Sequence, residues 1–465
     1  MNGRWATRLR DLATEEGVPG AALGVWADGQ EVLAAHGTLN AATGVNATPG
    51  SLFQIGSITK LWTATMIMQL AGEGRLSLDA TVADVLPGAG VGNPDGAGEI
   101  TIRHLLTHSS GIDGDIFTDT GRGADCLERY VGELAGAARI FPPGAAYSYC
   151  NSGFVLLGRI IEVLDGREWD ASLRERLIRP LNLTTTVTLP EEAILHRAAV
   201  GHRERSREGP VGCPPGIAPR AEPVSVWGLP RSIGPAGNII ATASDLLTFA
   251  RMHLDGGAAG DGTRVLGEDL VTAMQQLQLP VPPGGRIDAI GLAWRLFQWA
   301  DGKQIIGHDG NTVGQTAFLR MDPQTRVAAC LLTNSPQPDP LMRRLFTEIF
   351  AEHAGVTMPA EPGPAEGPVD VDLRQHAGRY ERTSRRFDVA VRDGQLHLVS
   401  SLTGDLAALS DEEPEEVVLY PADSSGERFV CRSSDSQPWT ALAFSRLADG
   451  TPYLFTGGRV TPRVG

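Results

Sequence analysis

A proline-rich stretch divides the chain into two parts with different patterns. The segment GVTMPAEPGPAEGP, which ends at Pro368, holds four prolines and no apolar periodicity, and this composition is typical of a linker. Residues 1–355 mix helical and strand patterns, so we expect one large α+β domain there. Residues 369–465 contain only short strand patterns, including two runs joined by Asp393-Gly394, and predict a small β-barrel. Residues 356–368 would be the linker.

Three stretches of the larger part predict its elements. VPGAALGVWADGQEVLAAHG reads as two strands joined at Asp28-Gly29, a strong hairpin signal. Apolar residues spaced by three and four from Leu61 to Ala71 predict a helix that begins near Ser57. The region around KQIIGHDGNTVGQTAFLRMDPQTRVAACLLTNS predicts two or three adjacent strands at the edge of an antiparallel sheet.

Composition narrows the class of partner. The 465 residues are 42% hydrophobic, which is enough for a large core. With 40 basic against 55 acidic residues, the net charge of -15 argues against nucleic acid or an anionic membrane as partner. The apolar run around Leu61 is far shorter than the roughly 20 residues of a membrane span. We therefore expect a peptide or small-molecule substrate, no nucleic acid and no membrane.

The cysteines and the N-terminal sequence bear on the compartment. The five cysteines are scattered and never form a CxxC pair, which indicates neither a disulfide framework nor a zinc cluster. MNGRWATRLRDLATEEG has no apolar signal-peptide core and reads as an amphipathic helix. These features predict a cytoplasmic protein, and no cofactor or metal is expected. His104 and His108 lie four apart on a predicted helix, but Leu105 replaces the glutamate of a zinc-protease motif, which favours structural histidines over zinc ligands.

Lysine usage singles out the stretch GSITK. Lys60 and Lys303 are the only lysines among 40 basic residues, and Lys60 follows Ser57 by three positions at a helix start. Arginine supplies charge but cannot release its proton, so a lysine here is a candidate base. Residues three apart share a helix face, which lets Lys60 reach Ser57. The alternative is a helix start followed by an ordinary lysine.

Two later motifs support a chemical role. Tyr149-Cys150-Asn151 lies in a polar turn before an amphipathic helix, and His308-Asp309-Gly310 ends a strand. Taken singly, each residue has an ordinary interpretation: a core tyrosine, a helix-capping asparagine and a strand-end histidine. Their order and wide spacing after Ser57 favour one acyl-transfer site.

These motifs together resemble the three signatures of the serine β-lactamase and penicillin-binding-protein superfamily. They are most similar to its class C β-lactamase, DD-peptidase and esterase branch, in which the third motif can start with histidine. The similarity covers roughly residues 10–350. It implies an antiparallel sheet flanked by helices plus an all-helical subdomain. The segment that begins near HAGRYE resembles the lipocalin-like β-barrel appended to some members.

The resemblance also implies roles for the site residues. Ser57 would be the nucleophile, Lys60 its activating base and Tyr149 the group that passes a proton to the leaving group. Asn151 and Gly310 would bind the substrate. His308 would tune Tyr149 or bind a carboxylate. The backbone N–H groups of Ser57 and Asn311 would form an oxyanion hole.

Two residues depart from this pattern or extend it. Asp309 occupies a position that is often Thr or Ser, so an acid would lie beside the strand that binds the substrate's anion. This substitution puts penicillin turnover in doubt unless Asp309 points away. In the predicted barrel, Arg446 is a candidate to bind a peptide's C-terminal carboxylate above the site.

Three functions remain open at this point. The first is a penicillin-binding-protein-type thioesterase, which takes a peptidyl thioester from a carrier protein onto Ser57, prefers a D-residue at the acylating end, and releases or cyclises the peptide. The second is a cytosolic hydrolase such as a D-aminopeptidase, amidase or carboxylesterase. The third is a sensor that is acylated without turnover. The sequence favours the first slightly, because it shows no leader and predicts an appended barrel.

Overall fold

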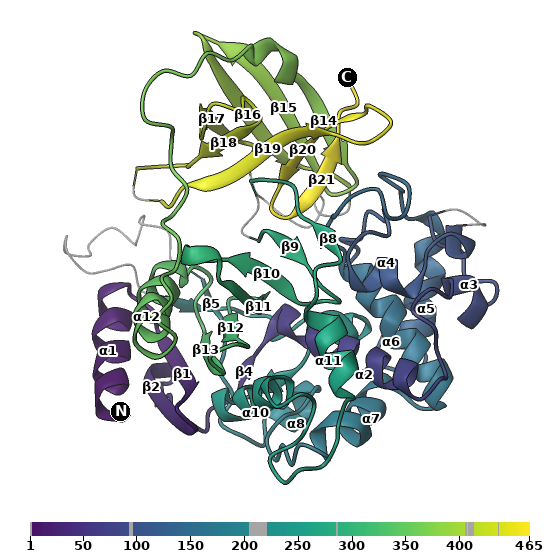
Figure 1. The fold of residues 1–465 in the computed structure, drawn as a ribbon, viewed down its shortest axis with the longest axis vertical. Helices are drawn as coiled ribbons and strands as arrows, with labels where there is room; N and C mark the ends of the chain where they lie inside the picture. Colours follow the sequence, from purple (N-terminus) through teal and green to yellow (C-terminus); the bar gives the residue numbers. More distant parts are fainter. Residues whose placement is uncertain are drawn as a thin grey trace.

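The computed structural model describes residues 2–92, 96–203, 221–284, 287–404, 407, 413–435 and 437–465. A large α+β part lies below a C-terminal β-barrel (Figure 1). The predicted fold class, α+β followed by a barrel, is confirmed. The Pro-, Gly- and Arg-rich sequence of residues 203–230 predicts a long loop, and most of it lies outside the described residues. None of the helices in the described ranges has the length and apolar character needed to cross a bilayer.

An antiparallel sheet forms the centre of the α+β part. In the described residues it has nine strands, ordered β3-β2-β1-β13-β12-β11-β10-β9-β8. Asp28 and Gly29 join the first hairpin with φ values of 53° and 72°, the left-handed conformations that such a turn requires. The strands are β1 (Gly20–Ala27), β2 (Gln30–Asn40), β3 (Val45–Asn46), β8 (Leu279–Pro280), β9 (Ala289–Ile290), β10 (Arg295–Gln298), β11 (Gln304–Asn311), β12 (Thr316–Asp322) and β13 (Val327–Thr333).

One expectation about this sheet is wrong. β11, β12 and β13 lie in its middle, not at its edge, because β1 pairs with β13 and β10 pairs with β11. β12 and β13 are buried along their whole length, as strands covered on both faces should be. Two further short pairs, β4 (Phe53–Gln54) with β7 (Ile240–Ala241) and β5 (His202–Arg203) with β6 (Glu222–Pro223), lie outside this sheet.

Helices cover both faces of the sheet. On one face α1 (Asn2–Glu15) and α12 (Asp339–His353) share a core with Leu23 and Val25 of β1. On the other face α10 (Ala243–Leu254) packs with Ala22 and with the helical subdomain, seen beside the sheet in Figure 1. The other helices are α2 (Thr59–Gly72), α3 (Val82–Val85), α4 (Ile102–Leu106), α5 (Cys126–Glu133), α6 (Asn151–Asp165), α7 (Trp169–Leu173), α8 (Pro190–Ala193), α9 (Gly234–Gly237) and α11 (Glu268–Gln275).

The helix that follows Ser57 lies at the centre of this arrangement. α2 is apolar on nearly all sides, because α6, α7 and α9 pack around it. Trp62 of α2 stacks on Phe249 of α10, with ring centroids 4.1 Å apart. The predicted helix is therefore confirmed, and its start is fixed against the rest of the core.

The C-terminal strands form an eight-stranded antiparallel barrel within the described residues. A bridge between Tyr380 and Arg463 joins its first and last strands. Asp393 and Gly394, with φ values of 50° and 78°, form the predicted turn. The strands are β14 (Gly378–Arg382), β15 (Arg385–Arg392), β16 (Gln395–Leu402), β17 (Glu415–Pro421), β18 (Arg428–Cys431), β19 (Thr440–Arg446), β20 (Pro452–Thr456) and β21 (Arg459–Pro462).

The last hairpin of the barrel docks on the α+β part. Tyr149 N–H donates to Gly458 O at 2.9 Å, and Val460 N–H donates to Ser148 Oγ at 3.2 Å. Phe455 and Val460 are fully buried in the same apolar cluster as Tyr149. The β20–β21 turn therefore lies directly over the second predicted motif.

Candidate active site

Ser57 and Lys60 form a close pair at the start of α2. Ser57 lies in the 3-10 turn Gly56–Ile58, and Lys60 lies in the first turn of the helix. Lys60 Nζ is 3.0 Å from Ser57 Oγ and donates to Ala236 O at 2.7 Å. Burial, followed by the charges of Arg295 and Arg459, holds the pKa of Lys60 well below its ordinary value. A neutral amine beside the hydroxyl can accept its proton.

Tyr149 lies against this pair. Lys60 Nζ is 4.9 Å from the centroid of the Tyr149 ring. Within the described part of the chain the phenol hydroxyl has no partner of ordinary hydrogen-bond geometry. Burial raises the pKa of Tyr149, while Arg295 and the nearby Ser57 side chain oppose that rise. Tyr149 is thus a neutral phenol that can pass a proton in the Ser57 network.

His308 approaches from β11. Its Nδ1 is 2.6 Å from Asp309 O, and because a carbonyl only accepts, Nδ1 carries the proton and Nε2 is an acceptor. The ring centroids of His308 and Tyr149 are 6.2 Å apart. Burial, then Arg295 and Lys60, hold the pKa of His308 well below its ordinary value. His308 is therefore neutral and does not supply the cation that this motif often carries.

Close backbone contact brings the two candidate oxyanion donors together. A Cβ at Gly310 would lie 1.9 Å from Ile55 O and 2.9 Å from Ser57 N, and one at Gly56 would lie 2.6 Å from Asn311 N. Ser57 is in the first turn of its helix, where N–H groups have no intrahelical acceptor. Asn311 Oδ1 accepts from Thr316 Oγ1 at 3.0 Å. The side chain of Asn311 is thus tied away, and its backbone is the part placed beside Ser57.

Asn151 is held by an aspartate that the sequence reasoning missed. Its Nδ2 donates to Asp115 Oδ1 at 3.0 Å, and Arg382 Nη1 lies 3.2 Å from Asp115 Oδ2. Burial alone would raise the pKa of Asp115, but Arg459 and Arg382 lower it below its ordinary value. The sequence offered no local sign of this role, because the partners of Asp115 come from distant parts of the chain.

Asp309 is paired with two arginines from the neighbouring strands. Arg295 Nη1 lies 3.0 Å and Arg320 Nη1 lies 2.6 Å from its two oxygens. Both arginines are register partners of Gly307, two residues along the same face of β11. The guanidinium carbon of Arg295 is 5.3 Å from the Tyr149 ring centroid. The acid that raised doubt about anion binding is therefore balanced by two cations.

The structure places another barrel arginine, not Arg446, beside Tyr149. Arg446 is exposed and donates to Gly450 O at 3.1 Å, at the opposite end of β20 from the turn that covers Tyr149. The structure does not bring it to the site. Arg459 occupies that place: Nη2 donates to Asp115 Oδ1 at 2.8 Å, and its guanidinium carbon is 5.1 Å from the Tyr149 ring centroid.

The two histidines of the TIRHLLTHSSGI stretch differ in their surroundings. His104 is half-buried, and its Nδ1 accepts from Thr101 N at 3.2 Å in a helix-capping contact. His108 is buried and stacks on Tyr149. The described residues include no group of three or more His, Cys, Asp or Glu side chains arranged to hold a metal ion.

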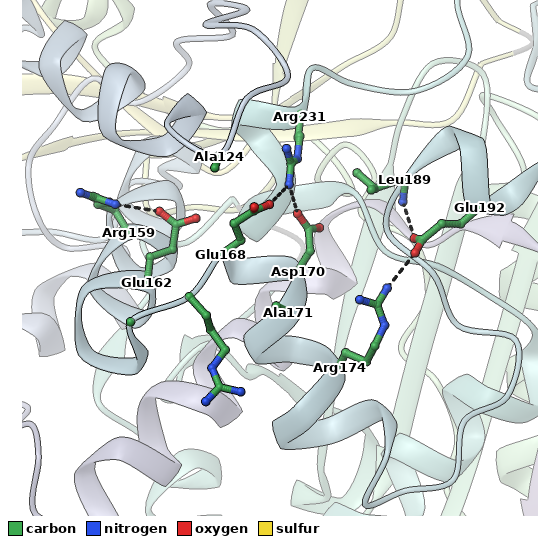
Figure 2. A pocket seen from close by; sticks show the side chains of 12 residues that line it. Ala124, Arg159, Glu162, Glu168, Asp170, Ala171, Arg174, Leu189, Glu192 and Arg231 are labelled. Atoms are coloured by element: carbon green, nitrogen blue, oxygen red, sulfur yellow. Dashed lines mark hydrogen bonds and ion pairs between the residues drawn. The ribbon is translucent and has the colours of Figure 1, made fainter.

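A groove in the helical subdomain is separate from this site. Figure 2 shows that most of its charged side chains pair with one another, including Arg159 with Glu162 within α6. Arg231 contacts both Glu168 and Asp170, and Arg174 Nη2 lies 2.7 Å from Glu192 Oε1. The groove, about 650 Å³ in volume, includes none of the predicted site residues in its described lining. The charged side chains of the groove neutralise one another, which explains why so many of them line it.

Residues 5–354 match the protein family described as Beta-lactamase. The chain belongs to the beta-lactamase family. Penicillin-binding protein 4 of Amycolatopsis lactamdurans is 45% identical over 384 residues, which are 82% of this chain and 98% of that protein. The predicted superfamily and the prediction of a serine hydrolase are confirmed.

Solved structures extend the likeness to the whole chain. The crystal structure of SurE matches with a TM-score of 0.79 and 29% identity, over 100% of this chain and 99% of SurE. The structure of D-amino acid amidase from Ochrobactrum anthropi SV3 with L-phenylalanine amide matches with a TM-score of 0.59 and 25% identity, over 72% of this chain and 91% of that one. The amidase thus matches a part of this beta-lactamase family member, and SurE matches both of its parts.

Proposed function

We propose that this protein forms an acyl-enzyme on Ser57 with a peptidyl thioester, and releases the peptide as a macrocycle or linear acid in the manner of a penicillin-binding-protein-type thioesterase. The donor would be a carrier-protein-bound peptide with a D-residue at its acylating end. The reaction would take place in the cytoplasm, where carrier-bound peptides are assembled.

The observation that carries this proposal is the two-part architecture, in which the last hairpin of the barrel docks on Tyr149 and which the crystal structure of SurE matches over the whole chain. A second SurE structure, solved with D-Leu, matches this chain over its full length with a TM-score of 0.75 and 28% identity. A D-residue bound by such a relative supports a D-configured acyl group here. The barrel supports release by the peptide's own amine, because its last hairpin lies over Tyr149 and would limit entry of water to the acyl-enzyme.

The chemistry assigns each step to residues of this chain. Lys60 takes the proton of Ser57 as Oγ attacks the thioester carbonyl. The N–H groups of Ser57 and Asn311 stabilise the oxyanion. Tyr149 delivers a proton to the leaving thiolate and takes one back from the Lys60 ammonium, which returns the amine to its neutral form. An amine of the peptide, or water, then attacks the acyl-enzyme and restores the Ser57 hydroxyl.

A second candidate is a hydrolase of D-amino-acid amides, peptides or esters. The match to D-amino acid amidase favours it, since that enzyme shares most of the α+β part. The same Ser57 chemistry would operate, with water as the acceptor in every turnover. A third candidate, a protein that is acylated without turnover, needs only the first half of the reaction.

One experiment separates the three candidates. The protein is incubated with a peptidyl N-acetylcysteamine thioester that ends in a D-residue, and the L-diastereomer serves as control. The products are identified by mass spectrometry. Cyclised product, one water lighter than the linear acid, is expected from the D-substrate and not from the L-substrate. Linear acid alone, together with equally fast hydrolysis of the corresponding D-amide, would support the hydrolase, whereas linear acid from the thioester only would be hydrolytic release by a thioesterase. A stable adduct on Ser57 would support the sensor. Ser57→Ala must abolish every product.

A further inference from the structure

The buried histidine His108 is hydrogen-bonded to the protein backbone on both sides of Tyr149. It follows α4, and only 1% of its surface is exposed. Ser148 N–H donates to His108 O at 2.8 Å, and Cys150 N–H donates to His108 Nδ1 at 3.0 Å. The two amides that flank Tyr149 are therefore both satisfied by His108.

The ring of His108 also contacts the Tyr149 side chain. The two ring centroids are 4.4 Å apart with an interplanar angle of 29°, which is a stacked arrangement. Phe154 of α6 and Tyr147 hold the other sides of the imidazole, with centroids 5.0 and 5.8 Å away. The Tyr149 phenol is thus fixed through its backbone and through its ring by the same residue.

The hydrogen bond from Cys150 N–H requires a neutral His108 imidazole in one tautomer. Because Cys150 N–H donates to Nδ1, the ring proton must be on Nε2, which is buried without a partner in the described chain. The backbone of His108 is also left-handed, with φ of 54°, a conformation that histidine and asparagine tolerate better than most residues. The charged and titratable groups that face the ring are Lys60, Arg295, Arg459, Tyr147, Tyr149, Cys150 and His308.

We propose that His108 is a positioning residue for the acyl-transfer reaction, holding the Tyr149 hydroxyl in line with Ser57 and Lys60. The sequence suggested only a structural histidine near a helix end. Contact with both neighbours of Tyr149 gives the residue a more specific task. The proposal rests on the serine-hydrolase chemistry of the family and does not require the substrate to be a thioester.

Two variants separate the hydrogen bond that His108 accepts from Cys150 from its ring contact with Tyr149. His108→Phe keeps a ring against Tyr149 but removes the acceptor of Cys150 N–H. His108→Asn keeps an acceptor near the place of Nδ1 and tolerates the left-handed backbone, but it removes the ring. His104→Asn is the matched control, since His104 lies one turn earlier and caps its own helix.

Labelling of Ser57 by a fluorophosphonate measures the effect without a known substrate. Ser57 Oγ displaces fluoride from phosphorus and loses its proton to the base, and the adduct is followed by intact-protein mass spectrometry. We expect the maximal labelling rate to fall about 100-fold in His108→Phe and about 10-fold in His108→Asn, with the half-saturating probe concentration within about threefold of wild type. His104→Asn should label within about twofold of wild type.

The pH dependence distinguishes positioning from loss of stability. In His108→Asn the smaller side chain admits water near Lys60, whose low pKa comes first from burial, so the acid limb of labelling should move to higher pH. In His108→Phe the limb should stay in place. A wild-type maximal rate in His108→Phe would overturn the proposal, and so would a loss in His108→Asn that appears only in probe affinity with an unmoved limb. If His108→Phe does not fold, His108→Asn decides alone.

Discussion

Lys60 shows how surroundings change the chemistry of a single side chain. An exposed lysine is protonated at neutral pH and cannot act as a base. Here the amine is fully buried beside Ser57, with Arg295 and Arg459 adding positive charge nearby. Both effects disfavour the ammonium form. The free amine is therefore available at a much lower pH than the ordinary lysine pKa would allow.

Replacing Lys60 by arginine tests this directly. Lys60→Arg keeps a cation that does not release its proton, so we expect kcat/KM on a p-nitrophenyl ester to fall about 1,000-fold or more. Lys303→Arg is the matched control, because the only other lysine is remote in sequence and bonds to Gln324 Oε1. It should leave kcat/KM unchanged. Retention of activity in Lys60→Arg would exclude Lys60 as the base.

The protonation state of Lys60 also determines how kcat/KM should depend on pH. Because the pKa of Lys60 is lowered, the active free amine persists as pH falls below the ordinary lysine value. In wild-type protein kcat/KM should therefore fall as the amine becomes protonated, and a pH–rate profile should place this acid limb well below the ordinary lysine pKa.

At the residue scale, local pairs were predictable and distant ones were not. Ser57 and Lys60 were identified because three positions along a helix start bring them together whatever the rest of the fold does. Asp115 and Arg459 were missed, since their contact joins residues 344 apart. The sequence does not show which end of a barrel strand faces the site, so it could not distinguish Arg446 from Arg459 as the arginine that lies near Tyr149.

At the scale of elements, the site depends on contact between β11 and the turn before α2. Gly310 and Gly56 permit this contact, since a Cβ on either would overlap backbone of the other segment. The motif order predicted that these segments belong to one site. The prediction of an edge position for β11 to β13 failed, because the distant strand β1 pairs with β13 and no local pattern records that pairing.

The pairing of Asp309 follows from the same register. Arg295 and Arg320 stand opposite Gly307 on the two strands beside β11 and reach Asp309 diagonally. A single sequence gives strands but not their register, so the acid looked like an obstacle to anion binding. In the sheet it is one member of a charge network that places Arg295 near Tyr149.

Substituting Gly310 tests the contact between the two elements. In Gly310→Ala the new methyl group would lie 1.9 Å from Ile55 O and 2.9 Å from Ser57 N, so it must push the two candidate oxyanion donors apart. We expect kcat on a p-nitrophenyl ester to fall about 100-fold or more. Gly260→Ala, where a Cβ meets no atom within 4 Å, should keep kcat within about twofold. Equal activity in both variants would show that the donors do not act through this contact.

At the scale of the whole molecule, the barrel takes part in the chemistry of the α+β part. Its last hairpin bonds to the backbone of Tyr149 and inserts Arg459 beside the Tyr149 ring. Arg459 is among the causes of the low pKa of Lys60, although the two residues are almost 400 positions apart. The barrel is thus an electrostatic part of the active site as well as a cover.

Arg459 and Arg446 give a paired test of this conclusion. Arg459→Ala removes one cation near Lys60, so the pKa of Lys60 should rise and the acid limb of kcat/KM should move to higher pH. It also leaves Asp115 with Arg382 and Asn151 alone, and we expect at least a tenfold loss on a p-nitrophenyl ester at neutral pH. Arg446→Ala, at the far end of β20, should change neither the limb nor the rate. An unmoved limb in Arg459→Ala, or an equal loss in Arg446→Ala, would mean that the barrel acts only as a lid, because a lid alone has no reason to distinguish these two arginines.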